Sequence, residues 1–421
     1  MPAAAQRVQA VYLLLTLLST LAASLIWGVN TLFLLDAGLT NTEAFAANAF
    51  FTMGQVMFEV PTGVLADVRG RRVSYLLGAS TLLLATLLYL MMWRAHAPLF
   101  GWAIASILLG LGFTFFSGAT EAWLVDALAF SGFDGKLDAV FAKGQMVAGV
   151  AMLVGSVAGG FVAQLTNLGV PYILRSILLG LTLVAAFFFM HDLGFTPQRG
   201  KGPIAEIRRV ARASLDEGWR KPPIRWLMLS APFTTGVGVY AFYALQPYLL
   251  ELYGDKTAFG VAGLAAAIVA GTQILGGFAV RFFGRAFRRR TDVLLVGLVM
   301  SIACLAVIGR TTSFGIAIGA LVVWGMAFSA VTPVRQAYLN GLIPSAQRAT
   351  VLSFDNLMGS AGGVVAQPAL GRAADAFGYP FSYVVSALLE LIALPFLLLA
   401  RRENTPSDAI ESEPAENALG H

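Results

Sequence analysis

The chain has little charge for its length of 421 residues. Only 12% of its residues are Asp, Glu, Lys or Arg, and 57% are hydrophobic. A soluble domain carries about a quarter charged residues. So few charges leave too little polar surface to keep the chain in water, which excludes an ordinary soluble protein.

Cysteine and histidine are also scarce. A single cysteine, Cys304, excludes a disulfide or a thiolate metal cluster within the chain. The histidines, His96, His191 and His421, lie far apart in the sequence, and no H-E-x-x-H, G-x-S-x-G or P-loop pattern occurs. We therefore expect no metal, no cofactor and no enzymatic activity.

Long apolar runs take the place of these features. A helix that crosses a bilayer needs roughly 20 apolar residues. The clearest runs are 10–35, 72–93, 99–125, 145–166, 170–190, 293–309 and 379–400, and weaker ones are 44–66, 224–250, 258–280, 314–339 and 350–371. They predict an all-α integral membrane protein with about twelve transmembrane helices.

The basic residues predict the orientation of these helices. With both termini placed in the cytoplasm, roughly 22 of the 28 Lys and Arg residues fall on the cytoplasmic side, as the positive-inside rule requires. The basic excess thus reflects contact with membrane lipids, and no nucleic acid partner is expected. The predicted location is the plasma (inner) membrane, with both termini cytoplasmic.

The longest polar interruption separates two similar halves. We predict a six-helix bundle at 1–192, a cytoplasmic linker at 193–222, a second bundle at 223–400 and a disordered tail at 401–421. The segment from Gly63 to Arg71 repeats the glycine and arginine spacing of Gly277 to Arg285. A second match pairs Gly159 to Gln164 with Gly362 to Gln367. Such repeats predict two pseudo-symmetric bundles with the substrate site near the midplane between them.

The loop after the second predicted helix carries a known family motif. The pattern G-x-L-x-D-x-x-G-R-R is complete at Gly63, Leu65, Asp67, Gly70, Arg71 and Arg72. On this motif the chain resembles a transporter of the major facilitator superfamily (MFS) over roughly residues 8–400. The resemblance implies that the loop is a cytoplasmic latch, in which the acid engages nearby arginines and a helix end of the other half. A plain cytoplasmic turn is the alternative reading.

The fifth predicted helix is similar to the antiporter signature of the same superfamily, g-x-x-x-G-P-x-x-G-G. Gly155, Gly159 and Gly160 match it, whereas Ser156 replaces the proline. An arginine common in helix four of proton antiporters is absent, and Ser106 stands in its place. The resemblance implies a drug/proton antiporter-like exporter, although close helix packing accounts for the glycines equally well.

Charged residues inside the predicted spans are candidates for coupling or gating, because such groups are costly in a bilayer. Glu59 and Glu121 are candidates for handling protons or substrate. The repeat lays Glu121 on Arg335, so we hypothesise that these two latch the cytoplasmic side. Asp36 and Arg175 are the corresponding candidates toward the outer face.

Aromatic and amide residues are candidates for the wall of a substrate cavity. The set comprises Trp27, Asn30, Phe116, Tyr240, Tyr243, Gln246 and Trp324. An aromatic wall with few polar anchors suits a lipophilic or amphiphilic compound better than a sugar. We expect a monomeric, proton-coupled exporter that works by alternating access. A proton- or sodium-coupled importer of a small organic solute is the alternative.

Overall fold

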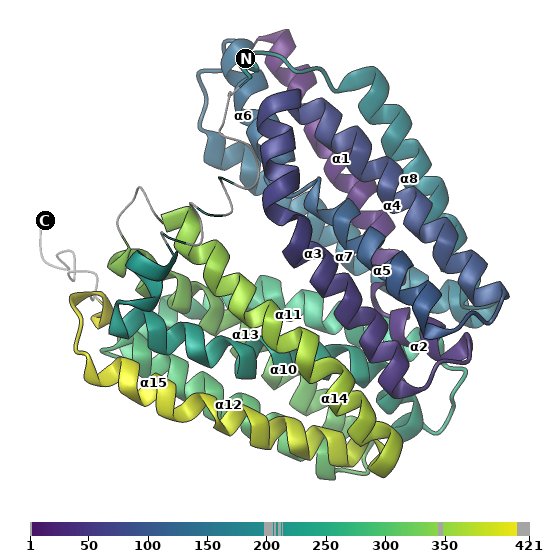
Figure 1. Ribbon diagram of the computed structural model, residues 1–421, viewed down its shortest axis with the longest axis vertical. Coiled ribbons are helices and arrows are strands. Elements are labelled where there is room, and N and C mark those ends of the chain that lie inside the picture. The colour runs from purple at the N-terminus through teal and green to yellow at the C-terminus, as the bar shows by residue number, and fades with distance from the viewer. Residues whose placement is uncertain are drawn as a thin grey trace, which may run out of the picture. The chain divides into compact units, whose positions relative to one another are not determined.

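The computed structural model describes residues 2–197, 205, 208, 212, 214–343 and 348–410, with the backbone alone at 214, 215, 217, 273–285, 349 and 350. The described residues form helices and one isolated β-bridge, between Arg289 and Ala409 (Figure 1). The helices are α1 Ala3–Trp27, α2 Asn30–Asp36, α3 Asn41–Arg69, α4 Arg71–Arg94, α5 Leu99–Thr114, α6 Ala119–Phe130, α7 Leu137–Leu165, α8 Gly169–Phe189, η1 Ser214–Trp219, α10 Pro222–Tyr253, α11 Phe259–Ala286, α12 Arg290–Arg310, α13 Phe314–Leu342, α14 Arg348–Leu391, α15 Ala393–Arg402 and η3 Pro406–Asp408.

The chain divides into two compact units. Unit 1 comprises Met1–Ile207 and Tyr243–Ala270, and unit 2 comprises Arg208–Phe242 and Gly271–His421. Within unit 1, α1 packs along α7 and α8, and α3 packs along α5. Within unit 2, α12 runs beside α13, α14 and α15. These units are defined by contacts in one conformation, whereas the bundles at 1–192 and 223–400 were inferred from the repeat, so the bundle boundaries stay a prediction.

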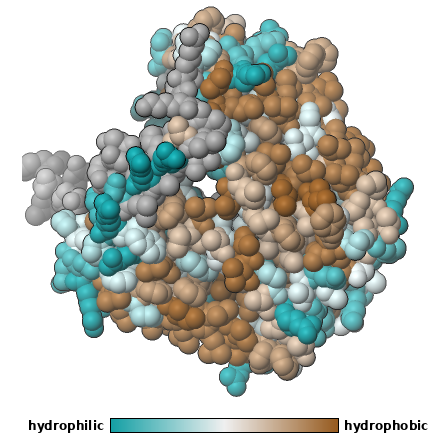
Figure 2. Space-filling model, in the orientation of Figure 1, coloured by the Kyte–Doolittle hydropathy of each residue, from teal (hydrophilic) through white to brown (hydrophobic). Residues whose placement is uncertain are grey.

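The helices are long and apolar enough to cross a membrane. Among the described residues, nine helical segments qualify by length and composition. Large apolar side chains such as Phe100, Leu165 and Phe188 are exposed, and apolar residues cover much of the visible face in Figure 2. An apolar surface of this extent is expected where side chains face lipid acyl chains.

Two of the predicted spans are interrupted in the structure, and a third break, at Gly378, separates the predicted spans 350–371 and 379–400. The span at 10–35 breaks after Trp27, where α1 ends and α2 begins at Asn30. The span at 99–125 breaks at Gly118, which has φ +68°. Within α14, Gly378 has φ +84°, so this element of 44 residues is two helices merged across a kink. Positive φ favours glycine, which explains why two of these breaks fall at glycines.

Glycines of the repeated sequence allow two helices to pack closely in each unit. A Cβ on Gly159 of α7 would collide with the carbonyl of Leu25 in α1, and a Cβ on Gly362 of α14 would collide with the backbone of Pro232 in α10. Each glycine therefore allows close backbone contact between the fifth and the first predicted span of its half. This shared packing supports the internal duplication.

A second structural repeat involves two aspartates. Oδ1 of Asp192, which follows α8, accepts the backbone N–H of Arg72 at 2.8 Å, and Oδ1 of Asp408 in η3 accepts the backbone N–H of Thr291 at 2.8 Å. Both carboxylates satisfy an N–H group at the start of a helix, α4 or α12, where negative charge is favourable. In each half of the sequence, the segment after the sixth predicted span is thus hydrogen-bonded to the start of the third.

The contacts of Asp408 correct one prediction. Residues 401–410 were expected to be disordered, but Asp408 is buried and Arg290 donates to the carbonyls of Ser407 and Ala409. The physical reason is the helix start of α12, whose free N–H groups bind this polar segment. The rest of the predicted tail, 411–421, lies outside the described residues, as do residues 198–204, 206, 207, 209–211 and 213 of the predicted linker and the side chains of Gly277 to Arg285.

Candidate functional site

Unit 1 contains a cavity of about 300 Å³ between α1, α3, α4, α5, α7, α8 and the end of α10. Three predicted cavity residues, Trp27, Asn30 and Tyr243, line it. The other walls are Ala23, Ser24, Ile26, Asn48, Phe51, Gln55, Tyr89, Leu109, Phe113, Met152 and Arg175. A volume of this order holds a small organic molecule.

Arg175 of α8 is the charged residue of this cavity. Its side chain is only 1% exposed, although arginine is rarely buried without a carboxylate partner. Nε donates to Thr86 Oγ1 at 3.1 Å, Nη1 donates to the carbonyl of Ala22 at 3.2 Å, and the guanidinium lies 5.8 Å from the ring centre of Phe113. All three partners are neutral.

The predicted outer pair of Asp36 and Arg175 does not form in this structure. Asp36 lies at the end of α2 and accepts a hydrogen bond from Trp93 Nε1 at 2.8 Å. Arg175 turns into the cavity instead, because Thr86 and Ala22 offer it oxygen atoms there. A gating role for the two residues stays a prediction.

A chain of hydrogen bonds orients the amides of the cavity. The hydroxyl of Tyr172 donates to Asn30 Oδ1 at 2.9 Å, and Asn30 Nδ2 donates to Asn48 Oδ1 at 2.9 Å. Asn48 Nδ2 is buried and has no partner. The ring of Tyr172 stacks on Phe33 at 3.9 Å between centres, which fixes the first donor of the chain.

Gln246 of α10 serves a different purpose from the predicted one. Its Nε2 donates to the carbonyl of Trp27 at 2.9 Å, and its Oε1 accepts the backbone N–H of Thr31 at 2.9 Å. Both backbone groups belong to the break between α1 and α2. One buried amide thus satisfies groups that the interrupted helix leaves free, which a membrane interior requires.

Two further cavity candidates are also held in packing contacts. Phe116 stacks on Tyr75 at 4.4 Å between ring centres, and the hydroxyl of Tyr240 donates to Ser382 Oγ at 2.7 Å. Neither residue lines either of the two cavities described in this section. Aromatic composition alone did not distinguish these packing positions from a cavity wall.

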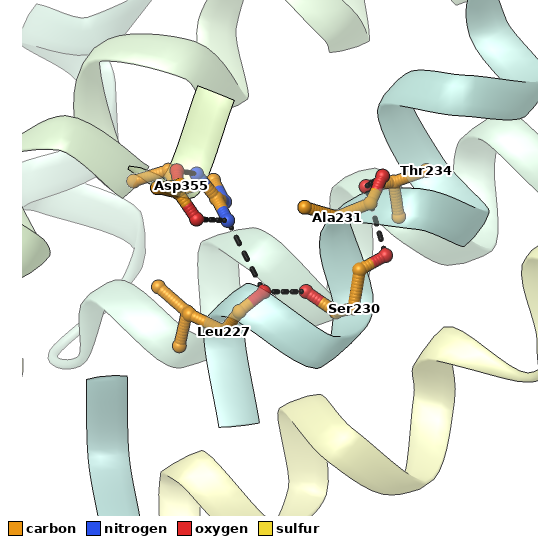
Figure 3. Close-up of polar contacts among 6 residues, drawn as sticks. Leu227, Ser230, Ala231, Thr234 and Asp355 are labelled. Atoms are coloured by element: carbon orange, nitrogen blue, oxygen red, sulfur yellow. Dashed lines mark hydrogen bonds and ion pairs between the residues drawn. The ribbon is translucent and has the colours of Figure 1, made fainter. Parts of the chain in front are cut away.

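Unit 2 contains a second cavity, of about 370 Å³, with the predicted Trp324 in its wall. Arg335 and Asp355 form a two-pronged ion pair there. Arg335 Nη2 donates to Asp355 Oδ1 at 2.6 Å and also to the carbonyl of Leu227 at 3.1 Å, which accepts the Ser230 hydroxyl as well (Figure 3). Asp355 is 4% exposed, so the pair neutralises itself inside the unit.

This pair bears on the predicted latch of Glu121 and Arg335. Arg335 has a carboxylate partner in its own unit, Asp355, which was not among the predicted residues. Glu121 is exposed in the first turn of α6. The latch between the two residues stays a prediction.

Glu390 is a second acid of the same cavity and was not among the predicted site residues. It is 2% exposed, and its Oε1 accepts the Ser301 hydroxyl at 3.0 Å, while Trp324 Nε1 donates to Ser301 Oγ at 3.0 Å. Glu390 Oε2 is buried without a partner. A single carboxylate in the apolar run 379–400 was the available signal, because acids are rare in such runs.

Glu59, in contrast, is exposed in this structure. Its Oε1 accepts a hydrogen bond from the Ser117 hydroxyl at 2.8 Å, close to the break between α5 and α6. Backbone carbonyls at this break accept bonds from Thr62 and Ser74, at 3.2 and 2.9 Å. The interrupted helix is thus supported by polar groups of α3 and α4, and Glu59 is not the desolvated carboxylate that was expected.

The predicted latch loop is compact. Arg71 Nη1 lies 2.5 Å from Asp67 Oδ1, and Arg72 donates to the carbonyl of Phe187 at 2.7 Å. Gly70 has φ +111°, and a Cβ there would collide with Asp192. Gly63 has open space around it. The acid therefore engages a neighbouring arginine, and Asp192 is an additional member of the loop. The role of the loop as a latch stays a prediction.

The glycines of the predicted helix-five motif lie at helix contacts. A Cβ on Gly155 would collide with the Ser24 side chain in α1, and one on Gly160 would lie 2.9 Å from the Cα of Gly263 in α11. Ser24 Oγ also donates to the carbonyl of Ala151 across the α1–α7 contact at 3.1 Å. Close packing therefore explains these positions in unit 1. Among the described residues, no group of His, Cys, Asp and Glu is suited to hold a metal ion.

Comparison with known proteins gives consistent results along the whole chain. A family model described as Major Facilitator Superfamily matches residues 12–288 and 257–420. An uncharacterized MFS-type transporter of Methanocaldococcus jannaschii is 18% identical over 90% of this chain and 94% of its own. The uncharacterized MFS-type transporter YxaM of Bacillus subtilis is 23% identical over 82% and 84%.

Solved structures share the fold at low sequence identity. The nucleoside transporter NupG is 13% identical, with a TM-score of 0.77 over 92% of this chain and 99% of that chain. A POT family transporter in complex with a thioalcohol-conjugated peptide is 12% identical, with a TM-score of 0.70 over 94% and 96%.

Proposed function

Because the chain belongs to the major facilitator superfamily, and is therefore a membrane transporter and not an enzyme, we propose that it exports a small lipophilic or amphiphilic compound in exchange for protons. It does so by alternating access, in which a central site opens to one side of the membrane at a time. The family match supports transport, and the carboxylate of Glu390 supports proton coupling.

We further propose twelve spans in two pseudo-symmetric six-helix bundles. Three segments supplement the nine that qualify by hydropathy and length. α3 carries several polar residues, α11 is described partly by its backbone, and α14 supplies two spans, since its 44 residues at 1.5 Å each would extend about 66 Å, twice a hydrocarbon core. The paired glycines and paired aspartate caps support the duplication.

Glu390 carries the proposal of proton coupling. An ionised carboxylate with an unpartnered oxygen is costly inside a protein unless a cation joins it. Arg335 lies in the wall of the same cavity, but Asp355 neutralises it. The buried thiol of Cys304 also lies near Glu390. Within the described part of the chain Glu390 has no cationic partner, and a proton that enters and leaves with the conformational change would neutralise it.

Import is the second candidate. The structural neighbours include a nucleoside transporter and a POT family transporter in complex with a conjugated peptide, and a shared fold leaves the direction of transport open. The direction of substrate flux in everted vesicles under an imposed pH gradient distinguishes the two directions.

Proteoliposomes with a pH-sensitive dye inside test the coupling. A compound selected by thermal stabilisation of the purified protein should drive proton flux. Glu390→Gln should reduce this flux at least tenfold while compound-for-compound exchange continues, because the neutral amide cannot release a proton. Asp138→Asn, an exposed position at the start of α7, is the control. Unchanged proton flux in Glu390→Gln would show that another group couples.

A further inference from the structure

The cavity of unit 1 holds a permanent positive charge that no described residue of its wall balances. Arg175 is fully buried, and its described partners are a hydroxyl, a carbonyl and an aromatic ring. Among the described residues that line the cavity there is no Asp or Glu. A guanidinium keeps its proton under ordinary conditions, so a bound anion would offset the cost of burying this charge.

The chain of hydrogen bonds between the amides of this cavity ends in a donor group. Asn48 Oδ1 already accepts from Asn30, whose own oxygen accepts from Tyr172. The remaining hydrogen-bonding group of the Asn48 side chain is Nδ2, which is buried and unpartnered. An unpaired buried donor is costly, and a ligand oxygen would remove the cost.

The rest of the wall is mainly apolar and aromatic, with Ser24 and Gln55 as further polar residues. Trp27, Phe51 and Phe113 line the cavity together with aliphatic residues. A sugar or nucleoside would leave most of its hydroxyls unpaired against such a wall, whereas the apolar body of an amphiphile would not. The site thus combines a cation, a free amide donor and an apolar surface.

We propose that this cavity binds the carboxylate of a small amphiphilic organic anion, with Arg175 as its counter-ion and Asn48 Nδ2 as a second donor. The inference rests on the proposed function, because it specifies the class of compound transported. Charge-assisted bonds between guanidinium and carboxylate are among the strongest in proteins, so recognition depends on the anionic group.

Binding to the purified full chain tests the site without any transport step. The probe is 1-naphthoate, followed by its fluorescence, and its neutral amide, naphthalene-1-carboxamide, is the matched ligand. Benzoate and decanoate extend the range of apolar bodies. Arg175→Gln should weaken naphthoate binding at least tenfold, the effect expected for loss of a charged hydrogen-bond partner. Arg310→Gln, an exposed arginine at the end of α12, should leave binding unchanged.

Asn48→Asp provides a variant that keeps the fold even if Arg175→Gln does not. The side chain is nearly isosteric, and the new carboxylate gives the cavity an internal anion. We expect an unaltered or higher melting temperature and at least tenfold weaker naphthoate binding. Equal affinity for naphthoate and its amide, or no binding of any of the three carboxylates, would overturn the proposal.

The same data separate this inference from the proposed function. If the carboxylates fail to bind but another compound drives proton flux in proteoliposomes, the site is wrong and proton-coupled transport stands. If naphthoate binds through Arg175 but no compound moves protons, the site stands and the coupling is wrong.

Discussion

At the scale of single residues, the latch loop requires a residue without a side chain at Gly70. Its φ of +111° and the collision of a Cβ with Asp192 both favour glycine. Gly70→Ala should lower the stability of the protein by about 1–3 kcal/mol, measured by thermal unfolding in detergent.

The matched control is Gly63→Ala in the same motif, because a Cβ there meets nothing within 4 Å. We expect no loss of stability from it. A loss of transport at Gly63→Ala without a loss of stability would indicate a contact made in another conformation of the transport cycle. Equal stability of the two variants would contradict the argument for Gly70.

The ion pair of Arg335 and Asp355 is a second feature at this scale. Asp355→Asn leaves a partly buried guanidinium without its partner, which should cost about 3 kcal/mol of stability. Asp292→Asn breaks an exposed pair with Arg401 and should cost less than about 1 kcal/mol. Thermal unfolding compares them, and a double variant with Arg335→Gln should recover part of the loss if the two side chains are coupled.

At the scale of helices, the contact between α1 and α7 depends on Gly159. Even one methyl group there would strike the carbonyl of Leu25, and backbone cannot give way as a side chain can. Gly159→Ala should therefore destabilise the protein by about 1–3 kcal/mol, whereas Gly180→Ala in α8 meets open space and should not. Similar melting temperatures for the two variants would show that the helices separate at little cost.

Interrupted helices are the other feature at this scale. The break after α1 is satisfied by Gln246, and the break after α5 by Thr62 and Ser74. Discontinuous helices with such support are common beside the binding sites of transporters. The α1–α2 break lies directly beside Trp27 and Asn30 of the unit 1 cavity. The interruption thus brings to the proposed anion site backbone groups and side chains that would point elsewhere in a continuous helix.

At the scale of the whole molecule, the orientation in the membrane is the main expectation. Cysteines at Arg69 and Arg288, both exposed, should react from the cytoplasm in a Cys304→Ala background, because the positive-inside rule places both loops there. Cysteines at Ala95 and Lys256 should react from the opposite side, since one span separates each from its partner loop. Labelling of Arg69→Cys and Arg288→Cys on opposite faces would contradict the duplicated architecture.

The sequence by itself determined the class of protein. Apolar runs of about 20 residues have few stable arrangements other than membrane helices, because a bilayer offers no partner for a free backbone group. The motif at Gly63 to Arg72 likewise predicted the superfamily that the family model confirmed. These features are local, so they can be read along the chain.

Only the tertiary structure decided which polar residues share a cavity. Arg175, Tyr89 and Asn48 come from three different helices, and Asp355 and Glu390 meet in the wall of one cavity although 35 positions apart. The direction in which a side chain points and the partners it finds depend on how helices pack, which helical period and composition leave open. For this reason Arg175 was expected at a gate and lies in a cavity, while Glu390 escaped notice inside an apolar run.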